Sequence, residues 1–196
     1  MFPLGNMSKP ETRAAARTHG LAVSEKQESQ EICFVPDGDY AGFIDRYLMA
    51  ENAGEQKPGT GEIIDSSGVV LGQHQGIHRY TIGQRRGIGI AGSRPLYVLS
   101  IDAAQNRVIV GEQNDLLQDS FLAVGVNWIS FDGPVEPIRA NVRIRYRHTE
   151  APAVVSPLGN DRARVDFEEA QRAITPGQAT VFYSGDEVLG GGWIAK

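Results

Sequence analysis

The sequence is poor in cysteine, with Cys33 as the only one among 196 residues. A single cysteine cannot form a disulfide within the chain, which fits the reducing cytoplasm. No apolar run approaches the roughly 20 residues of a membrane-spanning helix, and residues 1–5 are too short and uncharged for a secretory signal. These absences predict a cytoplasmic globular protein of one or two small domains, with no membrane partner.

Charge is unevenly distributed along the chain. The net charge of -5 argues by itself against a nucleic-acid partner. However, residues 78–94 contain four arginines and no acid, and residues 139–164 contain six arginines against two acids. Arginine is the basic side chain whose planar fork matches phosphate best. Because the local field decides where a polyanion binds, both windows are candidate RNA-binding surfaces.

Cys33 lies in a short apolar segment between Ile32 and Phe34, with Val35 directly after them. A proline and a glycine then break the chain. This pattern predicts a short buried strand followed by a turn, which would place a thiol beside a loop. Buried cysteines often only fill a core, so the residue types leave both a reactive sulfur and a packing role open.

The first part of the chain has helical patterns. Ser8 and Glu11 match a capping box, which predicts a helix to about residue 19, ended by Gly20. Residues 21–23 are expected to form a short strand or a connection. Apolar residues at 40, 43, 44, 47 and 48 fall on one helical face and predict a second helix, which Asp39 can cap. Residues 50–60 are expected to be a linker.

The remainder has a β pattern. Turn residues between apolar runs predict hairpins around residues 65–68 and 103–106. Further strands are expected at residues 122–129, 139–147, 153–156, 162–167, 179–183 and 188–194. Short strands at this spacing predict a small antiparallel barrel or sandwich. The expected fold is therefore mainly β with a short α/β N-terminal piece: residues 1–38, a small central β domain over 39–116, and an antiparallel β-barrel over 119–196.

A glycine-rich segment at residues 83–92 lies between the two predicted hairpins and contains Arg85 and Arg86. It lacks the Gly-Lys-Ser/Thr ending of a nucleotide-binding loop. Glycines let a ligand approach the backbone closely, so one interpretation is a site for an RNA phosphate backbone. The other is a glycine-rich turn with solvated arginines.

His74 and His78 are four residues apart, a spacing that zinc ligands can have. Glycines at 72 and 76 make a helix there doubtful, and the sole cysteine is distant in sequence. A zinc site needs further ligands, so the pattern does not indicate one.

Residues 139–147 alternate between polar and apolar side chains. The arginines of this segment would share one face of a strand: Arg139, Arg143, Arg145 and Arg147. Tyr146 falls on the inward face. Neighbouring positions on one face are about 6.5–7 Å apart, so the like charges repel and an anion facing them is favoured. The alternative is acidic cross-strand partners, which Asp166 and Glu168 could supply.

Several segments resemble motifs of one enzyme family, in the family's order. They are Phe-Pro-Leu-Gly at 2–5, Ser-Gln-Glu-Ile-Cys-Phe-Val at 29–35, Tyr-Thr-Ile-Gly-Gln-Arg-Arg-Gly at 80–87, Thr-Pro-Gly-Gln-Ala at 175–179 and Val-Phe-Tyr at 181–183. The chain thereby resembles the C-terminal half or so of the tRNA-specific 2-thiouridylases, bacterial enzymes that place sulfur on C2 of the wobble uridine. The family's ATP-pyrophosphatase domain, with its phosphate loop and first catalytic cysteine, has no counterpart here. Residues 1–38 would be the tail of that domain.

The resemblance implies roles for individual residues. Cys33 matches the cysteine that carries sulfur as a persulfide and delivers it to the adenylated uridine. Arg145, Tyr146 and Gln178 match positions that contact tRNA. We predict that the tRNA-binding set also includes five further arginines of the two basic windows: Arg139, Arg143, Arg147, Arg85 and Arg86.

The expected partners are a tRNA anticodon stem-loop, a sulfur-relay donor protein and, if the gene is split, a separately encoded ATP-pyrophosphatase half. ATP would be bound by the absent domain, and neither a cofactor nor a metal is expected in this chain, which alone should not complete turnover. Three interpretations stay open. The chain is an enzyme portion, a tRNA-binding module or remnant with an idle Cys33, or a translation-factor-like barrel unrelated to thiolation.

Overall fold

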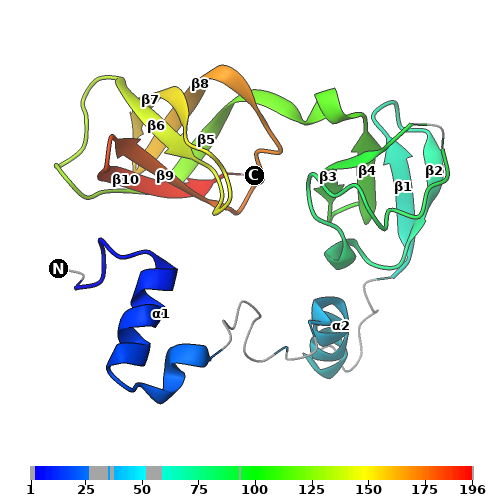
Figure 1. Cartoon of the computed structure of the whole chain (residues 1–196). Helices are drawn as coiled ribbons and strands as arrows, with labels where there is room; N and C mark the ends of the chain where they lie inside the picture. Colours follow the sequence, from blue (N-terminus) through cyan, green and yellow to red (C-terminus); the bar gives the residue numbers. More distant parts are fainter. Residues whose placement is uncertain (1–2, 27–34, 36–37, 52–58, 93, 196) are drawn as a thin grey trace. The chain divides into compact units, whose positions relative to one another are not determined.

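The computed structural model describes residues 3–26, 35, 38–51, 59–92 and 94–195 (Figure 1). The chain divides into two compact units, Met1–Ala53 and Gly54–Lys196, and each is considered by itself. Cys33, with the strand predicted around it, lies outside the described residues, as does most of the predicted linker. Within the described ranges, no helix is long and apolar enough to cross a membrane.

The first unit contains the helix α1 (Lys9–Thr18) and the short 3-10 helix η1 (Ala22–Glu25). The predicted capping box is confirmed, because the Glu11 carboxylate accepts hydrogen bonds from the backbone N–H and the hydroxyl of Ser8, both at 2.7 Å. Gly20 follows the helix with φ +65°, in the left-handed region that glycine adopts without strain. Of the two alternatives for residues 21–23, the structure has the connection, in which η1 forms a turn.

The second predicted helix is also confirmed, as α2 (Tyr40–Glu51). Asp39 caps it, since its Oδ1 accepts a hydrogen bond of 2.9 Å from the Gly42 N–H. The helix extends three residues beyond the apolar pattern that predicted it.

The second unit begins with a four-stranded sheet of order β2-β1-β4-β3. Its strands are β1 (Gly61–Asp65), β2 (Val70–His74), β3 (Tyr97–Asp102) and β4 (Arg107–Gly111). Both predicted hairpins are present, and the Asp65 carboxylate closes the first by accepting from the Ser67 and Val69 N–H groups at 2.9 Å. Sequence patterns did not indicate that β1 and β4 pair in parallel, which joins the hairpins into one sheet.

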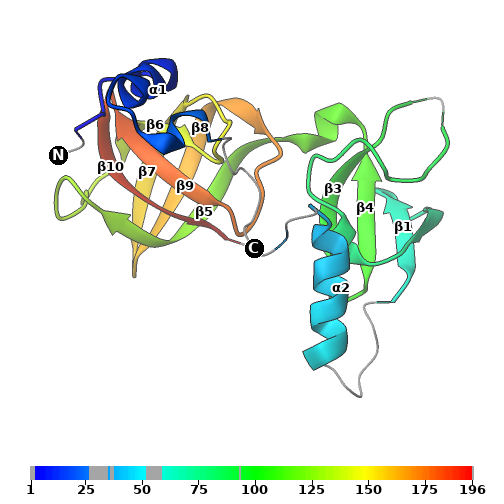
Figure 2. The ribbon, with the colours of Figure 1, turned by 60° about the horizontal axis from the view of Figure 1, so that its bottom comes forward.

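The remaining strands close into an antiparallel barrel of order β10-β5-β8-β7-β6-β9 (Figure 2). They are β5 (Leu117–Trp128), β6 (Ile138–Arg143), β7 (Ala151–Gly159), β8 (Arg162–Arg172), β9 (Ala179–Ser184) and β10 (Glu187–Ile194). The structure therefore has the barrel and not the sandwich, and the mainly β fold class is confirmed. A 3-10 helix, η3 (Gln113–Leu116), leads from the sheet into β5. Phe182 lies fully buried in the barrel core, against Trp128.

The strand predicted over residues 139–147 is wrong in its second half. β6 ends at Arg143, and Arg145–Arg147 form a turn in which the His148 N–H donates to the Arg145 carbonyl at 3.0 Å. The physical reason is pairing: β6 is bonded to β7 and β9 only as far as Val142 and Arg143. The inward position predicted for Tyr146 is wrong too, because the turn leaves this side chain 91% exposed.

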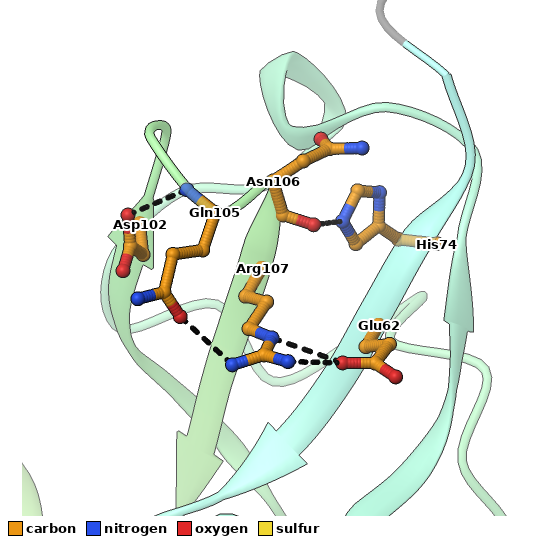
Figure 3. Close-up of polar contacts among 6 residues, drawn as sticks. All are labelled: Glu62, His74, Asp102, Gln105, Asn106 and Arg107. Carbon is orange, nitrogen blue, oxygen red and sulfur yellow. Dashed lines mark hydrogen bonds and ion pairs between the residues drawn. The ribbon is translucent and has the colours of Figure 1, made fainter.

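A cluster of polar side chains around the buried His74 joins the two hairpins of the sheet (Figure 3). Arg107 on β4 donates to the Glu62 carboxylate on β1 at 2.9 Å. His74 is buried, its Nδ1 accepts from the Gly76 N–H, and its Nε2–H donates to the Asn106 carbonyl, both at 3.0 Å. Both ring nitrogens of His74 thus form hydrogen bonds with backbone groups, so this histidine has a structural role.

Candidate nucleic-acid interface

A hollow of about 460 Å³ in the second unit brings together three segments that are far apart in the sequence. One comes from the loop before β3, one from the turn after β6, and one from the β8–β9 connection. Its lining residues are Thr81, Ile82, Gly83, Arg145, Arg172, Ala173, Thr175 and Gln178. We call it the Arg145 hollow. It unites two of the motifs that carry the family resemblance with two of the predicted RNA contacts, Arg145 and Gln178.

Arg145 is held in this hollow by neutral groups. Its Nη1 donates to the carbonyl oxygens of Arg172 at 3.0 Å and Ala173 at 3.3 Å. Within the described part of the chain, no carboxylate forms an ion pair with it. The guanidinium is therefore oriented while its positive charge is not compensated, which suits it to an anionic ligand.

The opposite wall depends on Gly83, which has φ +83°. A Cβ at this position would lie 3.1 Å from the Ala173 Cβ, closer than nine in ten real contacts of this kind. The Gly83 N–H donates to the Val98 carbonyl at 2.8 Å, which fixes the loop to β3. Glycine thus lets the loop before β3 approach the β8–β9 connection and narrows the hollow.

Gln178 lies at the rim on a braced backbone. Its N–H donates to the Thr175 carbonyl at 3.2 Å, and its own carbonyl accepts from the Ile194 N–H at 2.9 Å. The exposed side-chain amide lines the Arg145 hollow and can both donate and accept hydrogen bonds.

The other predicted arginines of β6 have acidic partners. Arg143 pairs with Glu150 at 2.9 Å and lies over the Tyr183 ring, whereas Arg139 pairs with Glu168 at 3.5 Å. The alternative of acidic partners therefore holds for these two positions. Asp166 instead pairs with Arg164 of its own strand. The predicted continuous row of cations does not exist, because two members are paired and the chain turns before the others.

Arg147, Arg85 and Arg86 are exposed. Arg147 lies beside Tyr146 in the turn after β6. Arg85 lines a second hollow of about 440 Å³, formed by the glycine-rich segment at residues 87–92 together with Arg94, which pairs with Glu112 at 2.7 Å. Of the predicted RNA contacts, the structure brings Arg145 and Gln178 together in one hollow, and Cys33 lies outside the described residues.

His148 is a residue of this region that sequence reasoning missed. Its Nε2–H donates to the Gln171 Oε1 at 3.0 Å, which ties the turn after β6 to the end of β8. Burial lowers the pKa of His148 below its usual value, the charges of Arg145 and Arg143 lower it further, and the bond to Gln171 acts in the opposite direction. The ring is therefore neutral near pH 7. Nothing in the sequence identified this contact, because it joins positions 23 residues apart.

Three family models match the chain in succession. The model described as a tRNA methyl transferase HUP domain matches residues 1–37, a tRNA methyl transferase PRC-barrel domain matches 43–112, and an aminomethyltransferase beta-barrel domain matches 118–194. The match to the HUP domain is thus limited to the first 37 residues of this chain.

Curated relatives match over nearly the whole chain. Proteins named tRNA-specific 2-thiouridylase MnmA are 53% identical in Solibacter usitatus, over 99% of this chain and 53% of the relative, and 52% identical in Syntrophotalea carbinolica, over 100% and 53%. The namesake from Koribacter versatilis is 48% identical over 99% of this chain and 52% of its own length. The chain thus spans about half the length of the curated relatives it matches.

Proposed function

This chain belongs to the tRNA-specific 2-thiouridylase family, and we propose that it supplies the sulfur-carrying cysteine and a tRNA-binding surface to the cytoplasmic, ATP-dependent thiolation of the wobble uridine. The observation that carries the RNA-binding part is the Arg145 hollow, where an uncompensated guanidinium and a free amide face the same space. Both residues match positions that contact tRNA in the family that the chain resembles.

The chemistry divides between this chain and the ATP-binding part of the family. That part adenylates the C2 oxygen of the uridine. The terminal sulfur of a Cys33 persulfide then attacks C2, and AMP departs with the former C2 oxygen. A second cysteine, which this sequence lacks, pairs with Cys33 to release the sulfur. A thiol reductant would first open the disulfide formed in this step, after which a sulfur-relay donor protein would reload Cys33. ATP would not contact this chain.

The proposed division of the chain follows from these roles. Residues 1–38 carry Cys33 as the tail of the catalytic domain, residues 39–116 form the central domain, and residues 119–196 form the tRNA-binding barrel. The anticodon stem-loop would reach Arg145 and Gln178 in the hollow, with the exposed Tyr146 and Arg147 beside them. Arg85 and Arg86 would extend the basic surface over the central domain, and Arg139 and Arg143 over the barrel.

The RNA-binding part is tested by titrating a tRNA anticodon stem-loop with this chain at several salt concentrations. Loss of one phosphate contact in Arg145→Ala should flatten the dependence of log K on log salt by about one unit and weaken binding about tenfold. Gln178→Ala should weaken binding without changing the slope, because the amide is neutral. The matched control is Arg164→Ala, which removes an arginine that is already paired with Asp166.

Native protein that does not bind the stem-loop at low salt would refute the RNA-binding role, as would equal effects of Arg145→Ala and Arg164→Ala. The sulfur-transfer part needs a separate assay with the ATP-binding part of the family supplied. There, Cys33→Ser should abolish formation of 2-thiouridine and leave RNA affinity unchanged. If Cys33→Ser retained thiolation, Cys33 would not be the sulfur carrier.

A further inference from the structure

We infer that Tyr97 and Arg172 form a positioning pair, which transmits the placement of the four-stranded sheet to Arg145 and so sets its orientation toward RNA. The inference rests on the proposed function for its RNA readout. Neither residue was identified as a site residue from the sequence, and Tyr97 cannot touch RNA itself because its side chain is only 5% exposed.

The first link is a contact between the sheet and the barrel. The Arg172 guanidinium, at the end of β8, lies 4.8 Å from the centre of the Tyr97 ring, at the start of β3. This distance is within the range of a cation–π interaction. The ring is fixed from its other end, since the Tyr97 hydroxyl donates to the Gln113 Oε1 at 3.2 Å.

The second link is the backbone of the same residue. The Arg172 carbonyl accepts the 3.0 Å hydrogen bond from Arg145, and the next carbonyl, that of Ala173, accepts the 3.3 Å bond. Arg172 therefore contacts the sheet with its side chain and holds Arg145 with its main chain. A displacement of the Arg172 backbone would therefore move both acceptors of the Arg145 guanidinium.

The third observation is backbone strain at the adjacent residue. Ala173 has φ +56°, a left-handed conformation that costs a non-glycine residue free energy. Several bonds hold it there: its N–H donates to the Leu116 carbonyl at 2.9 Å, and its carbonyl also accepts from the Thr175 hydroxyl at 3.0 Å. Strained backbone persists only where the surroundings fix it. The strained segment that carries the acceptors of Arg145 thus depends on its surroundings, and the contact between Tyr97 and Arg172 is one of them.

The decisive variant is Tyr97→Leu, assayed in the whole chain with a tRNA anticodon stem-loop across a salt series. We expect binding to weaken three- to tenfold and the salt slope to flatten by about one unit, because the Arg145 guanidinium is then no longer oriented toward a phosphate. The Arg172 guanidinium also lines the Arg145 hollow, so a change in slope is assigned to Arg145 only where the side-chain signals of Arg145 shift as well. Tyr97→Phe keeps the ring but loses the hydroxyl bond to Gln113, so it should weaken binding less than Tyr97→Leu does.

Two further variants separate positioning from stability. Val108→Ala removes a fully buried side chain from the same sheet core without touching Arg172, and should lower stability while leaving the slope unchanged. Arg172→Lys keeps the charge and the carbonyl but loses the planar face, so it should flatten the slope even if Tyr97→Leu does not fold. The side-chain N–H signals of Arg145 in NMR spectra should shift in both positioning variants without RNA.

The results distinguish this inference from the proposed function. The positioning role alone would be overturned if folded Tyr97→Leu and Arg172→Lys both bound RNA with the native affinity and salt slope. In that case Arg145→Ala would still weaken binding. A slope change in Val108→Ala equal to that in Tyr97→Leu would overturn it as well. If the native chain does not bind RNA, the proposed function fails, and unchanged Arg145 NMR signals in the two variants would overturn the positioning geometry independently.

Discussion

Replacing Gly61 with alanine should destabilise the sheet selectively, and the size of the effect follows from the polar cluster in Figure 3. A Cβ at Gly61 would overlap the Asn106 carbonyl oxygen and would lie 2.6 Å from His74 Nε2. These two atoms form the 3.0 Å hydrogen bond that satisfies the buried imidazole. The methyl group cannot be accommodated without separating them.

Two costs therefore add, and one small gain opposes them. Forcing a methyl group into packed surroundings costs typically 1–3 kcal/mol, and leaving a buried hydrogen-bonding group unsatisfied costs a similar amount, about 1–3 kcal/mol. Alanine also has less conformational freedom than glycine in the unfolded chain, which stabilises the folded state by roughly 0.4–1 kcal/mol. We expect Gly61→Ala to reduce the free energy of unfolding by about 3 kcal/mol.

The matched control is Gly68→Ala in the turn between β1 and β2. Gly68 has φ +88° but nothing lies within 4 Å of its would-be Cβ, so only backbone strain of about 1 kcal/mol is expected. Amide hydrogen exchange in β1–β4 measures both variants. Both tryptophans, Trp128 and Trp193, lie in barrel strands, so tryptophan fluorescence reports the barrel and should be unchanged at low denaturant. If the sheet amides were as well protected from exchange in Gly61→Ala as in Gly68→Ala, the steric argument would be refuted.

Three other variants test the remaining packing and titration arguments. Phe182→Ala should cost the barrel about 3–5 kcal/mol, measured by urea unfolding with fluorescence of Trp128, whose ring centre lies 5.6 Å from that of Phe182; a cost below that of a surface substitution would contradict the assigned core. Ser8→Ala should reduce the stability of α1 by about 1 kcal/mol, seen as faster amide exchange in its first turn. His148→Gln tests pH dependence: because the folded pKa of His148 is lowered, the unfolded chain binds its proton more readily, so native stability is complete above the unfolded pKa and falls as pH drops through it toward the folded value. Urea midpoints from pH 7.5 to 5.5 should fall more in the native protein than in His148→Gln, and parallel curves would contradict the assignment.

The elements that sequence predicted well are those whose signals are local. The capping box of α1 lies within four residues, and the hairpin at Asp65 depends on a side chain that bonds its own turn. Alternation of apolar residues located all six barrel strands, although β5, β7 and β8 extend several residues further than the pattern. In each case the residues that decide the structure are neighbours in the chain, so the pattern carries the information.

What could not be predicted depends on contacts between distant residues. The parallel pairing of β1 with β4 joins Glu62 to Arg107, 45 residues away, and nothing in either segment specifies it. The end of β6 is set by where its partner strands stop, so the arginine pattern continued in the sequence after the strand had ended. Tyr146 was therefore placed inward by an alternation that no longer applied.

The arginines at residues 139–147 differ in how their charges are compensated, and this bears on the proposed RNA binding. In a continuous strand, four cations would have repelled each other and needed an anion only to offset that repulsion. In the structure, Arg139 and Arg143 are offset by carboxylates, so releasing them to bind phosphate would cost existing ion pairs. Arg145 is bound by carbonyl oxygens, which fix its direction and leave its charge available. A guanidinium that is already ordered loses little rotamer freedom on binding, so the same charge gives more affinity there than on a free surface side chain. Under the proposed function, the turn that ended the predicted strand is what orients one arginine of a basic segment toward a phosphate.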